Sequence, residues 1–383
     1  MGYNISRCQK TDGVDIVKKV LIFSASTGGG HNIAAKSLRE HFEASACDAI
    51  TYDAFKETSS ILDNVISKGY EKIVQITPRT YGRLYRAANN ETLSHYVIAV
   101  ITDIAEKRLL KIIQSENPAL IVVTHPLVTN VLGTLKGEGE FDTPIISIVT
   151  DYMIHRAYLN KNVSAYIVGS EYTKEDMIEK GVPGDKIYPY GIPVRKSFLD
   201  YNSKIIKDYD VDLSVLLMRG SVGVSQVEKA LSSLLKTKHY LKIIVVCGNN
   251  EKLKKRIEKL VQEEETTKKI EIHGFVEQIP KLMDMADVII TKPGGLTTTE
   301  AIIKNIPMII PYYIPGQEEE NADFLQETGM AIKVDHIEDI TSVVDHLVTN
   351  KDILDNMAKN MSELSKEQSI ERIIKLGNEL MNK

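Results

Sequence analysis

The stretch VLIFSASTGGGHNIAAKSL, residues 20–38, contains the pattern that decides the fold. An apolar run of strand length leads into three glycines and a histidine, and an amphipathic helical pattern follows. Similar apolar runs recur along the chain, and they are continuous stretches rich in Val and Ile rather than alternating ones. Strands that are buried on both faces of a parallel sheet have this composition. We therefore predict an α/β protein in which strand–helix units build doubly wound sheets.

The strand-like runs form two sets, and a polar segment separates them. The first set lies at 20–25, 119–125, 144–151 and 165–170, and the second lies at 213–220, 241–248, 269–275, 287–295 and 308–313. Segment 191–210 opens on Gly and Pro and then turns polar, as linkers do. A chain of 383 residues is long enough for two domains. We predict two Rossmann-like domains, at residues 18–195 and 200–365.

Composition and charge exclude several classes of protein. The net charge of −5 argues against nucleic-acid binding by the whole surface. Cys8, Cys47 and Cys247 are too few and too scattered for a disulfide framework, and they offer no metal-ligand spacing. The N-terminus has no apolar signal core, and no apolar run reaches the roughly 18 residues of a membrane span. We expect a cytoplasmic protein, soluble or peripheral to a membrane, with no bound metal and no nucleic-acid partner.

The loop TGGGHN at the end of the first strand does not match the common nucleotide motifs. No lysine follows the last glycine, so it is not a Walker A loop, and Ile33 occupies the place of the third glycine of a dinucleotide motif. Asp53, about 20 residues further on, leaves a weak dinucleotide alternative. The glycines allow close approach of a ligand, and His31 at the helix start could act as a general base. A packed or helix-capping histidine is the simpler alternative.

Two loops of the second domain have the features of phosphate sites. The turn at 218–226 exposes backbone N–H groups around Gly220, Ser221 and Gly223, and Arg219 adds a positive charge. The turn at 291–302 places two glycines directly before a helix, where an anion is favoured. Its members are Gly294, Gly295, Leu296 and Thr297. Ordinary glycine turns are the alternative for both loops.

Polar residues suited to sugar recognition follow these loops. The carboxylate of Glu300 could accept hydrogen bonds from both hydroxyls of a ribose, or it could only stabilise the helix N-terminus. Gln317, Glu318 and Asn321 offer the donors and acceptors that sugar hydroxyls need. Because His31 would face these groups from the first domain, the four loops together predict a sugar-nucleotide transferase.

Residues 57–115 interrupt the strand–helix alternation. They combine cations and tyrosines with an unusually apolar helical pattern at 93–105. Such a segment can lie on an anionic membrane surface, and a packed helical insertion with solvated cations is the simpler alternative. The cations and tyrosines of this segment include Arg79, Tyr81, Arg83 and Tyr85.

Seven motifs carry a resemblance that runs from about residue 18 to 365. In order, they are STGGGHNIAAKSL, THPLVTNVLG, VTDY, YGIPVRKSF, CGNN, HGFVEQIPKLMDMADVIITKPGGLTTTEAI and PGQEEENADFL. Together they resemble the GT-B glycosyltransferases that make glycosyl-diacylglycerols, namely the bacterial diacylglycerol glucosyltransferases and the plant monogalactosyldiacylglycerol synthases. More distantly, the chain is similar to the N-acetylglucosaminyltransferase that forms lipid II.

The resemblance implies an architecture and a reaction. It implies two Rossmann-like domains facing a cleft, with a C-terminal helix at 366–383 that packs back on the first domain. The implied enzyme is an inverting transferase that moves a hexose from a UDP-sugar to diacylglycerol without a tightly bound cofactor. A processive enzyme, which adds further hexoses to its product, is compatible with the resemblance. Glucose is the favoured hexose, and galactose or another lipid-linked acceptor such as a peptidoglycan precursor is the alternative. The implied location is peripheral, on the cytoplasmic face of the membrane, with Arg79, Tyr81, Arg83 and Tyr85 near the lipid head groups.

The resemblance also implies roles for single residues. His31 faces the reaction centre and Glu300 binds the ribose of UDP. The diphosphate is held by Gly294, Gly295, Leu296 and Thr297 with Gly220 and Ser221, the uracil by Phe275 and Val276, and the hexose by Gln317, Glu318 and Asn321, while Gly30 and Arg219 complete the donor-binding set. Plant relatives have an aspartate where this chain has Ser26, which favours His31 as the base and leaves Asp151 in reserve.

Overall fold

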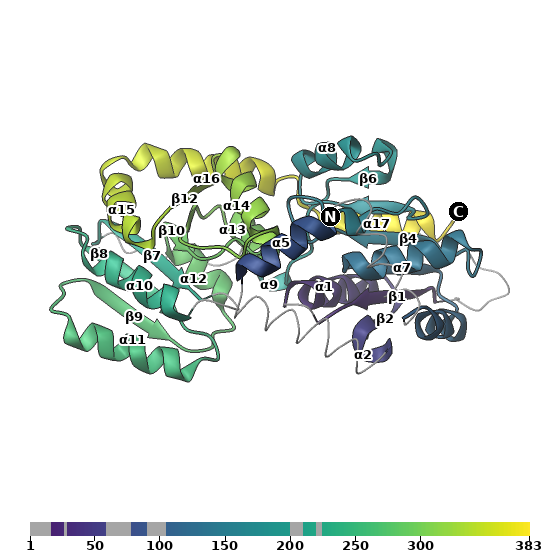
Figure 1. Ribbon diagram of the computed structural model, residues 1–383, viewed down its shortest axis with the longest axis horizontal. Coiled ribbons are helices and arrows are strands. Elements are labelled where there is room, and N and C mark those ends of the chain that lie inside the picture. The colour runs from purple at the N-terminus through teal and green to yellow at the C-terminus, as the bar shows by residue number, and fades with distance from the viewer. Residues whose placement is uncertain (1–16, 27–28, 59–77, 90–104, 200–209, 220–223) are drawn as a thin grey trace, which may run out of the picture.

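The protein is described by a computed structural model covering residues 17–26, 29–58, 78–89, 105–199, 210–219 and 224–383. Two parallel sheets, each of six strands, form the two halves of the molecule (Figure 1). Helices cover the faces of these sheets, so the central strands are buried apolar runs, as predicted, while the edge strands at 48–53 and 269–273 are mostly half-buried. Residues 200–209, where the second domain was predicted to begin, lie outside the described part.

The first sheet has the strand order β2-β1-β3-β4-β5-β6. Its chain leaves β1 toward β2 on one side and returns to β3 on the other, which makes the β1/β3 boundary the switch point where open α/β sheets bind ligands. Phe23 pairs with Val123, so β1 and β3 end level with each other. The strands are β1 (Lys19–Ser24), β2 (Asp48–Asp53), β3 (Leu120–Val123), β4 (Ile145–Ile148), β5 (Ala165–Ile167) and β6 (Ile187–Tyr188), and the helices are α1 (Gly30–Ala44), α2 (Ala54–Thr58), α5 (Pro78–Ala88), α7 (Pro126–Gly137), α8 (Glu171–Glu179) and α9 (Lys196–Leu199).

The second sheet has the order β12-β11-β10-β7-β8-β9, so its switch point lies between β7 and β10. The loops predicted to hold phosphate, at 218–226 and 291–302, leave these two strands. The strands are β7 (Leu213–Met218), β8 (Leu241–Val246), β9 (Lys269–His273), β10 (Val288–Ile290), β11 (Met308–Ile310) and β12 (Ala331–Lys333). The helices are α10 (Val224–Leu235), α11 (Glu251–Glu263), α12 (Ile279–Met285), α13 (Gly295–Ile303), α14 (Gln317–Glu327), α15 (Ile340–Thr349) and α16 (Lys351–Ser365).

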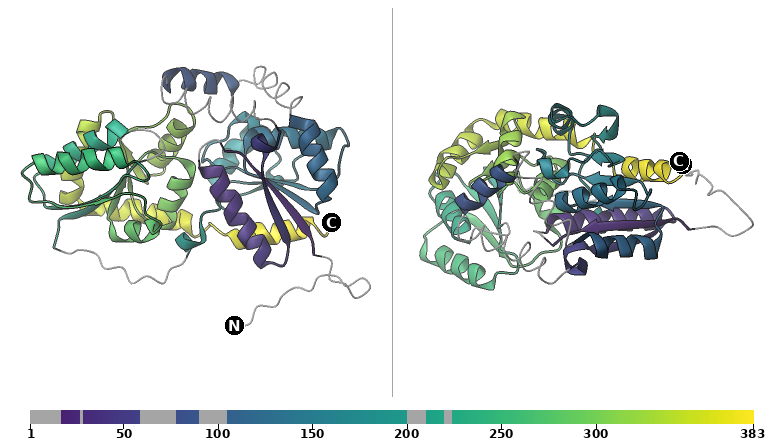
Figure 2. Two further views of the ribbon diagram at one scale, coloured as in Figure 1. Left: turned by 90° about the horizontal axis from the view of Figure 1, so that it is seen from below. Right: turned by 45° about the vertical axis from the view of Figure 1, so that its right-hand side comes forward.

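Helix α17 (Ile370–Leu380) returns to the first half of the molecule, where Figure 2 shows it in yellow alongside the first sheet. Its apolar face joins the core formed by β1 and β3, with Ile373 and Ile374 packed against their outer side. A Cβ on Gly377 would lie 2.9 Å from the ring of Phe42 in α1, so the two helices approach closely there. The first core is therefore completed by residues from the far end of the sequence.

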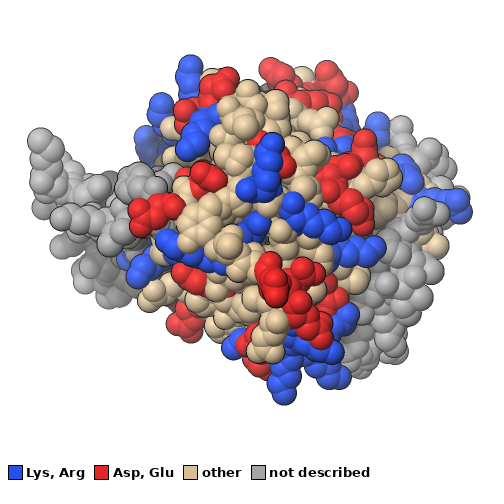
Figure 3. Space-filling view, turned by 90° about the vertical axis from the view of Figure 1, so that its left-hand side faces the viewer, with Lys and Arg blue, Asp and Glu red and all other residues tan. Residues whose placement is uncertain are grey.

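Both signs of charge mix on the outer end of the second half (Figure 3). On α11, Lys254 lies 3.9 Å from Glu258 and Lys259 lies 3.5 Å from Glu263, as expected for pairs four residues apart in a solvated helix. This face carries no extended patch of a single sign that would favour an anionic surface. Within the described residues, no helix is both long and apolar enough to span a bilayer.

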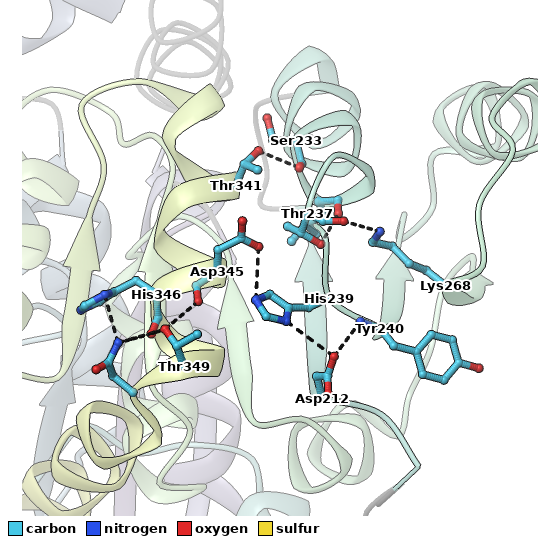
Figure 4. Close-up of polar contacts among 12 residues, drawn as sticks. Asp212, Ser233, Thr237, His239, Tyr240, Lys268, Thr341, Asp345, His346 and Thr349 are labelled. Atoms are coloured by element: carbon cyan, nitrogen blue, oxygen red, sulfur yellow. Dashed lines mark hydrogen bonds and ion pairs between the residues drawn. The ribbon is translucent and has the colours of Figure 1, made fainter.

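The amino edge of the second sheet is fixed by polar contacts far from the strand ends where ligands bind (Figure 4). His239 lies between two carboxylates, with Nδ1 3.6 Å from Asp212 and Nε2 3.8 Å from Asp345 on α15. Lys268 donates to the carbonyls of Leu235 and Thr237 before β8. These contacts hold α10 and α15 on the sheet, and this edge supplies control positions for the experiments below.

Candidate active site

Loops from the two halves meet directly at the carboxyl ends of the strands. A Cβ on Gly295, the first residue of α13, would lie 1.9 Å from the carbonyl oxygen of Thr150. A Cβ on Gly30 would lie 3.4 Å from Cδ2 of Leu296. The TKPGGL loop therefore contacts the first half of the molecule at Gly30 and at Thr150.

We expect Gly295→Ala to separate these loops, because the added methyl group meets backbone and not a flexible side chain. The radius of gyration in small-angle scattering should rise and the thermal midpoint should fall. The matched control is Gly29→Ala in the facing loop, where a Cβ meets nothing within 4 Å. Equal behaviour of the two variants would contradict the steric role of Gly295.

His31 lies at the start of α1 and is fixed in one orientation. Its Nδ1 is 2.5 Å from the carbonyl oxygen of Thr124 and 3.2 Å from the hydroxyl of Thr150. A carbonyl can only accept, so we assign the ring proton to Nδ1, which leaves Nε2 with a free lone pair. Burial lowers the pKa of His31 to about 4, and the bond to Thr124 opposes this only in part. His31 is therefore a neutral imidazole at pH 7, in the form that a general base requires.

A second histidine, His125, follows β3 and lies beside His31. The ring centroids are 4.8 Å apart, with the rings at 64° in an edge arrangement. The motif THPLVTNVLG contains His125, but the sequence alone suggested no role for this residue. Its position directly after a buried strand at the switch point was the available signal.

Asp151 follows β4 and is held by the second half of the molecule. Its carboxylate accepts from the amide of Gln317 and, at 3.1 Å, from Nδ2 of Asn321. Burial raises the pKa of Asp151 to about 6, and these two hydrogen bonds oppose that rise. The structure thus brings the predicted reserve base and two predicted hexose-binding residues together.

Asn321 is fully buried and uses its whole amide within the protein. Its Oδ1 accepts from the backbone N–H of Tyr152 at 2.9 Å, and its Nδ2 also donates to the carbonyl of Pro293 at 3.1 Å. The Tyr152 ring stacks on Phe324, 4.6 Å between centroids, inside the core of the second half. Tyr152 therefore anchors the first half in the second, a role that the sequence did not reveal.

The predicted diphosphate loop lies at the start of α13. Gly294 caps that helix without a side-chain hydrogen bond, and Leu296 and Thr297 lie in its first turn. Lys292 just before the loop pairs with Glu318, whose other oxygen accepts from the Ile314 N–H at 3.0 Å. Arg219 ends the strand beside this loop, while Gly220 and Ser221 lie outside the described residues.

Glu300 is buried in α13 and pairs with the segment that joins the halves. Its Oε1 accepts from Arg195 at 2.8 Å. Burial raises the pKa of Glu300, and Arg195 opposes that rise. Phe275, with 65% of its surface exposed, and the half-buried Val276 lie beyond β9. Exposure of so large an apolar ring fits a surface that a flat ligand could cover.

Comparisons with known proteins match nearly the whole chain. The monogalactosyldiacylglycerol (MGDG) synthase model matches residues 31–194, and the glycosyl transferases group 1 model matches residues 202–368. A processive diacylglycerol beta-glucosyltransferase from Bacillus pumilus is 31% identical over 363 residues, which cover 93% of this chain and 94% of that protein. This chain belongs to that family of glycosyltransferases. A protein of the same name from Bacillus subtilis has the same identity and coverage.

Solved structures show that the glycosyltransferase has the predicted GT-B fold. MurG from Acinetobacter baumannii superposes with a TM-score of 0.67 at 17% identity, covering 94% of this chain and 99% of its own. The glycosyltransferase of kitacinnamycin gives 0.64 at 12% identity, with 95% and 99% coverage. At these identities the likeness concerns the fold alone.

Helix α5 of the glycosyltransferase packs on the loop before α14. A Cβ on Gly82 would lie 2.6 Å from Cβ of Pro315, and the hydroxyl of Tyr85 donates to Glu320 at 2.9 Å. Burial raises the pKa of Glu320 to about 7, and the bond from Tyr85 opposes this rise. The Tyr85 hydroxyl is thus engaged within the protein and not directed at a head group.

The structure describes the side chains of only some of the other residues expected near lipid. Tyr81 is half-buried and Arg83 is exposed, while the side chain of Arg79 lies outside the described part, as do segments 59–77 and 90–104. A membrane role for Arg79, Tyr81 and Arg83 stays a prediction. The described residues of the glycosyltransferase contain no group of three or more metal-ligating side chains.

Ser26 of the glycosyltransferase contacts a carboxylate at the end of the neighbouring strand. Its hydroxyl donates to Asp53 at the end of β2, and Asn32 donates to Ser26 at 3.1 Å. Lys56 lies 3.4 Å from the same carboxylate. Asp53, on which the weak dinucleotide alternative depends, is therefore engaged by Ser26 and Lys56.

Proposed function

We propose that this glycosyltransferase transfers a hexose, glucose in the first place, from a UDP-sugar to the free hydroxyl of diacylglycerol. The observation that carries the proposal is the 31% identity to processive diacylglycerol beta-glucosyltransferases over 93% of the chain. Similarity that spans both halves includes the donor side and the acceptor side of the cleft. Further additions of glucose to the product are part of the proposal, since the relatives are named processive.

The proposed reaction is a single displacement with inversion at the anomeric carbon. The acceptor hydroxyl gives its proton to Nε2 of His31 as its oxygen bonds to the anomeric carbon. The bond from that carbon to UDP breaks, and its electron pair leaves on the diphosphate. The supporting geometry is the fixed Nδ1–H bond of His31 to Thr124, which leaves on Nε2 the lone pair that a base needs.

The leaving diphosphate would lie at the start of α13. Backbone N–H groups of Gly295, Leu296 and Thr297 have no partners within the first turn of a helix, and the helix dipole favours negative charge there. Lys292 adds a cation nearby. Preorganised donors of this kind stabilise charge that develops in the transition state.

Glu300 would bind the ribose, and its ion pair with Arg195 would hold the carboxylate in place. We expect Glu300→Ala to raise the Michaelis constant for the UDP-sugar about tenfold and to change kcat little, because the lost hydrogen bonds serve donor binding. Arg195 is exposed enough to be solvated after the change, so the thermal midpoint should move little. Initial rates at varied donor concentration measure the effect, and a fall in kcat alone would contradict it.

The membrane location is also proposed, with the enzyme peripheral on the cytoplasmic face. Support comes from the match of residues 31–194 to a lipid glycosyltransferase model and from the exposed Arg83 on α5. The mixed charges at the outer end of the second half direct the proposed contact to the first half.

A UDP-galactose-dependent activity is the second candidate. The observation that favours it is that the model matched by residues 31–194 is named for monogalactosyldiacylglycerol synthase. Glucose and galactose differ in one hydroxyl, so the two candidates share every residue assigned above.

The test is incubation of the purified full chain with vesicles of diacylglycerol and an anionic phospholipid. Labelled UDP-glucose and UDP-galactose are supplied in separate reactions, and the lipids are separated by thin-layer chromatography. We expect labelled glycolipid from UDP-glucose, with more than one sugar at long times. Label from UDP-galactose alone would select the second candidate, and no labelled lipid from either donor would overturn the proposal.

A further inference from the structure

His125 is a buried histidine with an unused ring nitrogen next to the proposed base. Only 6% of its surface is exposed, and its Nδ1 is buried without a hydrogen-bond partner in the described part of the chain. It precedes Pro126 at the start of α7 but makes no side-chain cap bond there. Buried polar atoms without partners are rare in native proteins, so the enclosure of Nδ1 bears on which nitrogen of the ring carries the proton.

Packing fixes the ring of His125 on two sides. The edge contact to His31 is joined by a second one to Phe55, with 5.1 Å between centroids and an angle of 80°. Its position after β3 places it across the switch point from His31, which follows β1. The two imidazoles therefore lie side by side where an open α/β sheet binds its ligand.

The two rings carry their protons on different nitrogens. The carbonyl of Thr124 fixes the proton of His31 on Nδ1, so its Nε2 accepts. In His125 the enclosed nitrogen is Nδ1, and a buried N–H without an acceptor is disfavoured more than a bare nitrogen. Burial and the charge of His31 hold the pKa of His125 well below its usual value, so the ring is neutral. Its proton then lies on Nε2, which donates.

Resting on the function proposed above, we propose that His125 donates from Nε2 to an ester carbonyl of the acceptor lipid and so selects acylated glycerol. A hydroxyl that loses its proton needs an acceptor, which is His31. A carbonyl can only accept and needs a donor, which is His125. In diacylglycerol the free hydroxyl and the nearest ester lie on adjacent carbons, so two neighbouring imidazoles of opposite character match both groups. His125 is thus a specificity-determining residue.

The test compares diacylglycerol with a dialkylglycerol of equal chain length, which keeps the hydroxyl and lacks the carbonyls. The wild-type enzyme should prefer the ester by roughly 3- to 10-fold in kcat/KM, the effect of one hydrogen bond. His125→Phe keeps a ring against Phe55 but cannot donate, and it should reduce the ratio to about 1. His125→Gln places an amide N–H near the position of Nε2 and should restore the preference.

Two measurements keep failure of folding separate from loss of recognition. The thermal midpoint and the affinity for UDP should match the wild type in the Gln variant. His125→Asn is a second variant without the donor, because its amide reaches only the Nδ1 position. The control is His346→Phe, an exposed histidine on α15 that should leave the ratio unchanged.

The outcomes separate this inference from the proposed function. A wild-type enzyme that glycosylates neither lipid would overturn the function itself. Transfer to both lipids at equal kcat/KM, or a Phe variant that retains the ester preference, would overturn the role of His125 and leave the function standing.

Discussion

Replacement of His31 by alanine should lower kcat by about 10²- to 10⁴-fold, the usual contribution of a positioned general base. The affinity for UDP should stay within about twofold, because His31 makes its hydrogen bonds to Thr124 and Thr150 within the first half of the molecule. Turnover is measured with diacylglycerol vesicles, and UDP affinity is measured by titration calorimetry. The control is His346→Ala at the far end of the second half, which should leave both quantities unchanged. Equal losses in turnover and in UDP affinity would remove the assignment of His31 as base.

The pH dependence of kcat/KM separates His31 from Asp151 as the base. The pKa of His31 is lowered to about 4 by burial, so a reaction that needs the neutral ring keeps its rate between pH 7 and pH 5. The pKa of Asp151 is raised to about 6 by burial, so a reaction that needs this carboxylate loses about tenfold per pH unit below 6. We expect the first profile, in the wild type and also in Asp151→Asn. An acid limb near pH 6 that disappears in Asp151→Asn would assign the proton transfer to Asp151.

Asn321→Leu should be the most destabilising single change at the site. The new side chain has similar volume, but it leaves the Tyr152 N–H, the Pro293 carbonyl and one oxygen of Asp151 without their partner. Each unpaired buried group costs about 1–3 kcal/mol, so we expect a loss of about 3 kcal/mol or more in the free energy of unfolding. Urea denaturation followed by circular dichroism measures it.

The loss should grow with pH. Asn321 stabilises the ionised form of Asp151, so its removal raises the pKa of that carboxyl further. Below pH 6 the carboxyl is largely protonated and needs the amide less. The loss grows above pH 6 and is complete above the higher pKa that Asp151 has in the variant. The matched control is Asn360→Leu, which removes two hydrogen bonds to carbonyls within the second half and none to the first. A loss as small as that of the control, or one independent of pH, would contradict the role of Asn321.

The sequence predicted every central strand of both sheets, and of the four edge strands it predicted only β9. β2, β6 and β12 escaped prediction, and all three lie at sheet edges. β2, with the sequence DAITYD, lies at the sheet edge and is mostly half-buried, so its composition shows no apolar run. β6 and β12 also lie at sheet edges and are only partly buried, so neither is part of a long apolar run.

The loops of the site were predictable because each follows a buried strand, but their mutual contacts were not. Glycines before a helix and a histidine after a glycine run are local signals. The bonds of Asp151 to Gln317 and Asn321 join residues more than 160 positions apart, and no local pattern encodes such a pair. Tyr152 follows a strand of the first half and packs in the core of the second, which only the tertiary arrangement determines.

The return of α17 to the first sheet has a consequence for how the protein is made. Ile373 and Ile374 complete the core that begins with Val20 and Ile22, so the ribosome has already synthesised the whole second sheet before the first core can close. During translation the outer side of β1 and β3 lacks its covering helix and exposes apolar surface, which favours aggregation. Early chain termination upstream of α17 would therefore leave a protein with an intact donor half and an acceptor half that cannot finish folding.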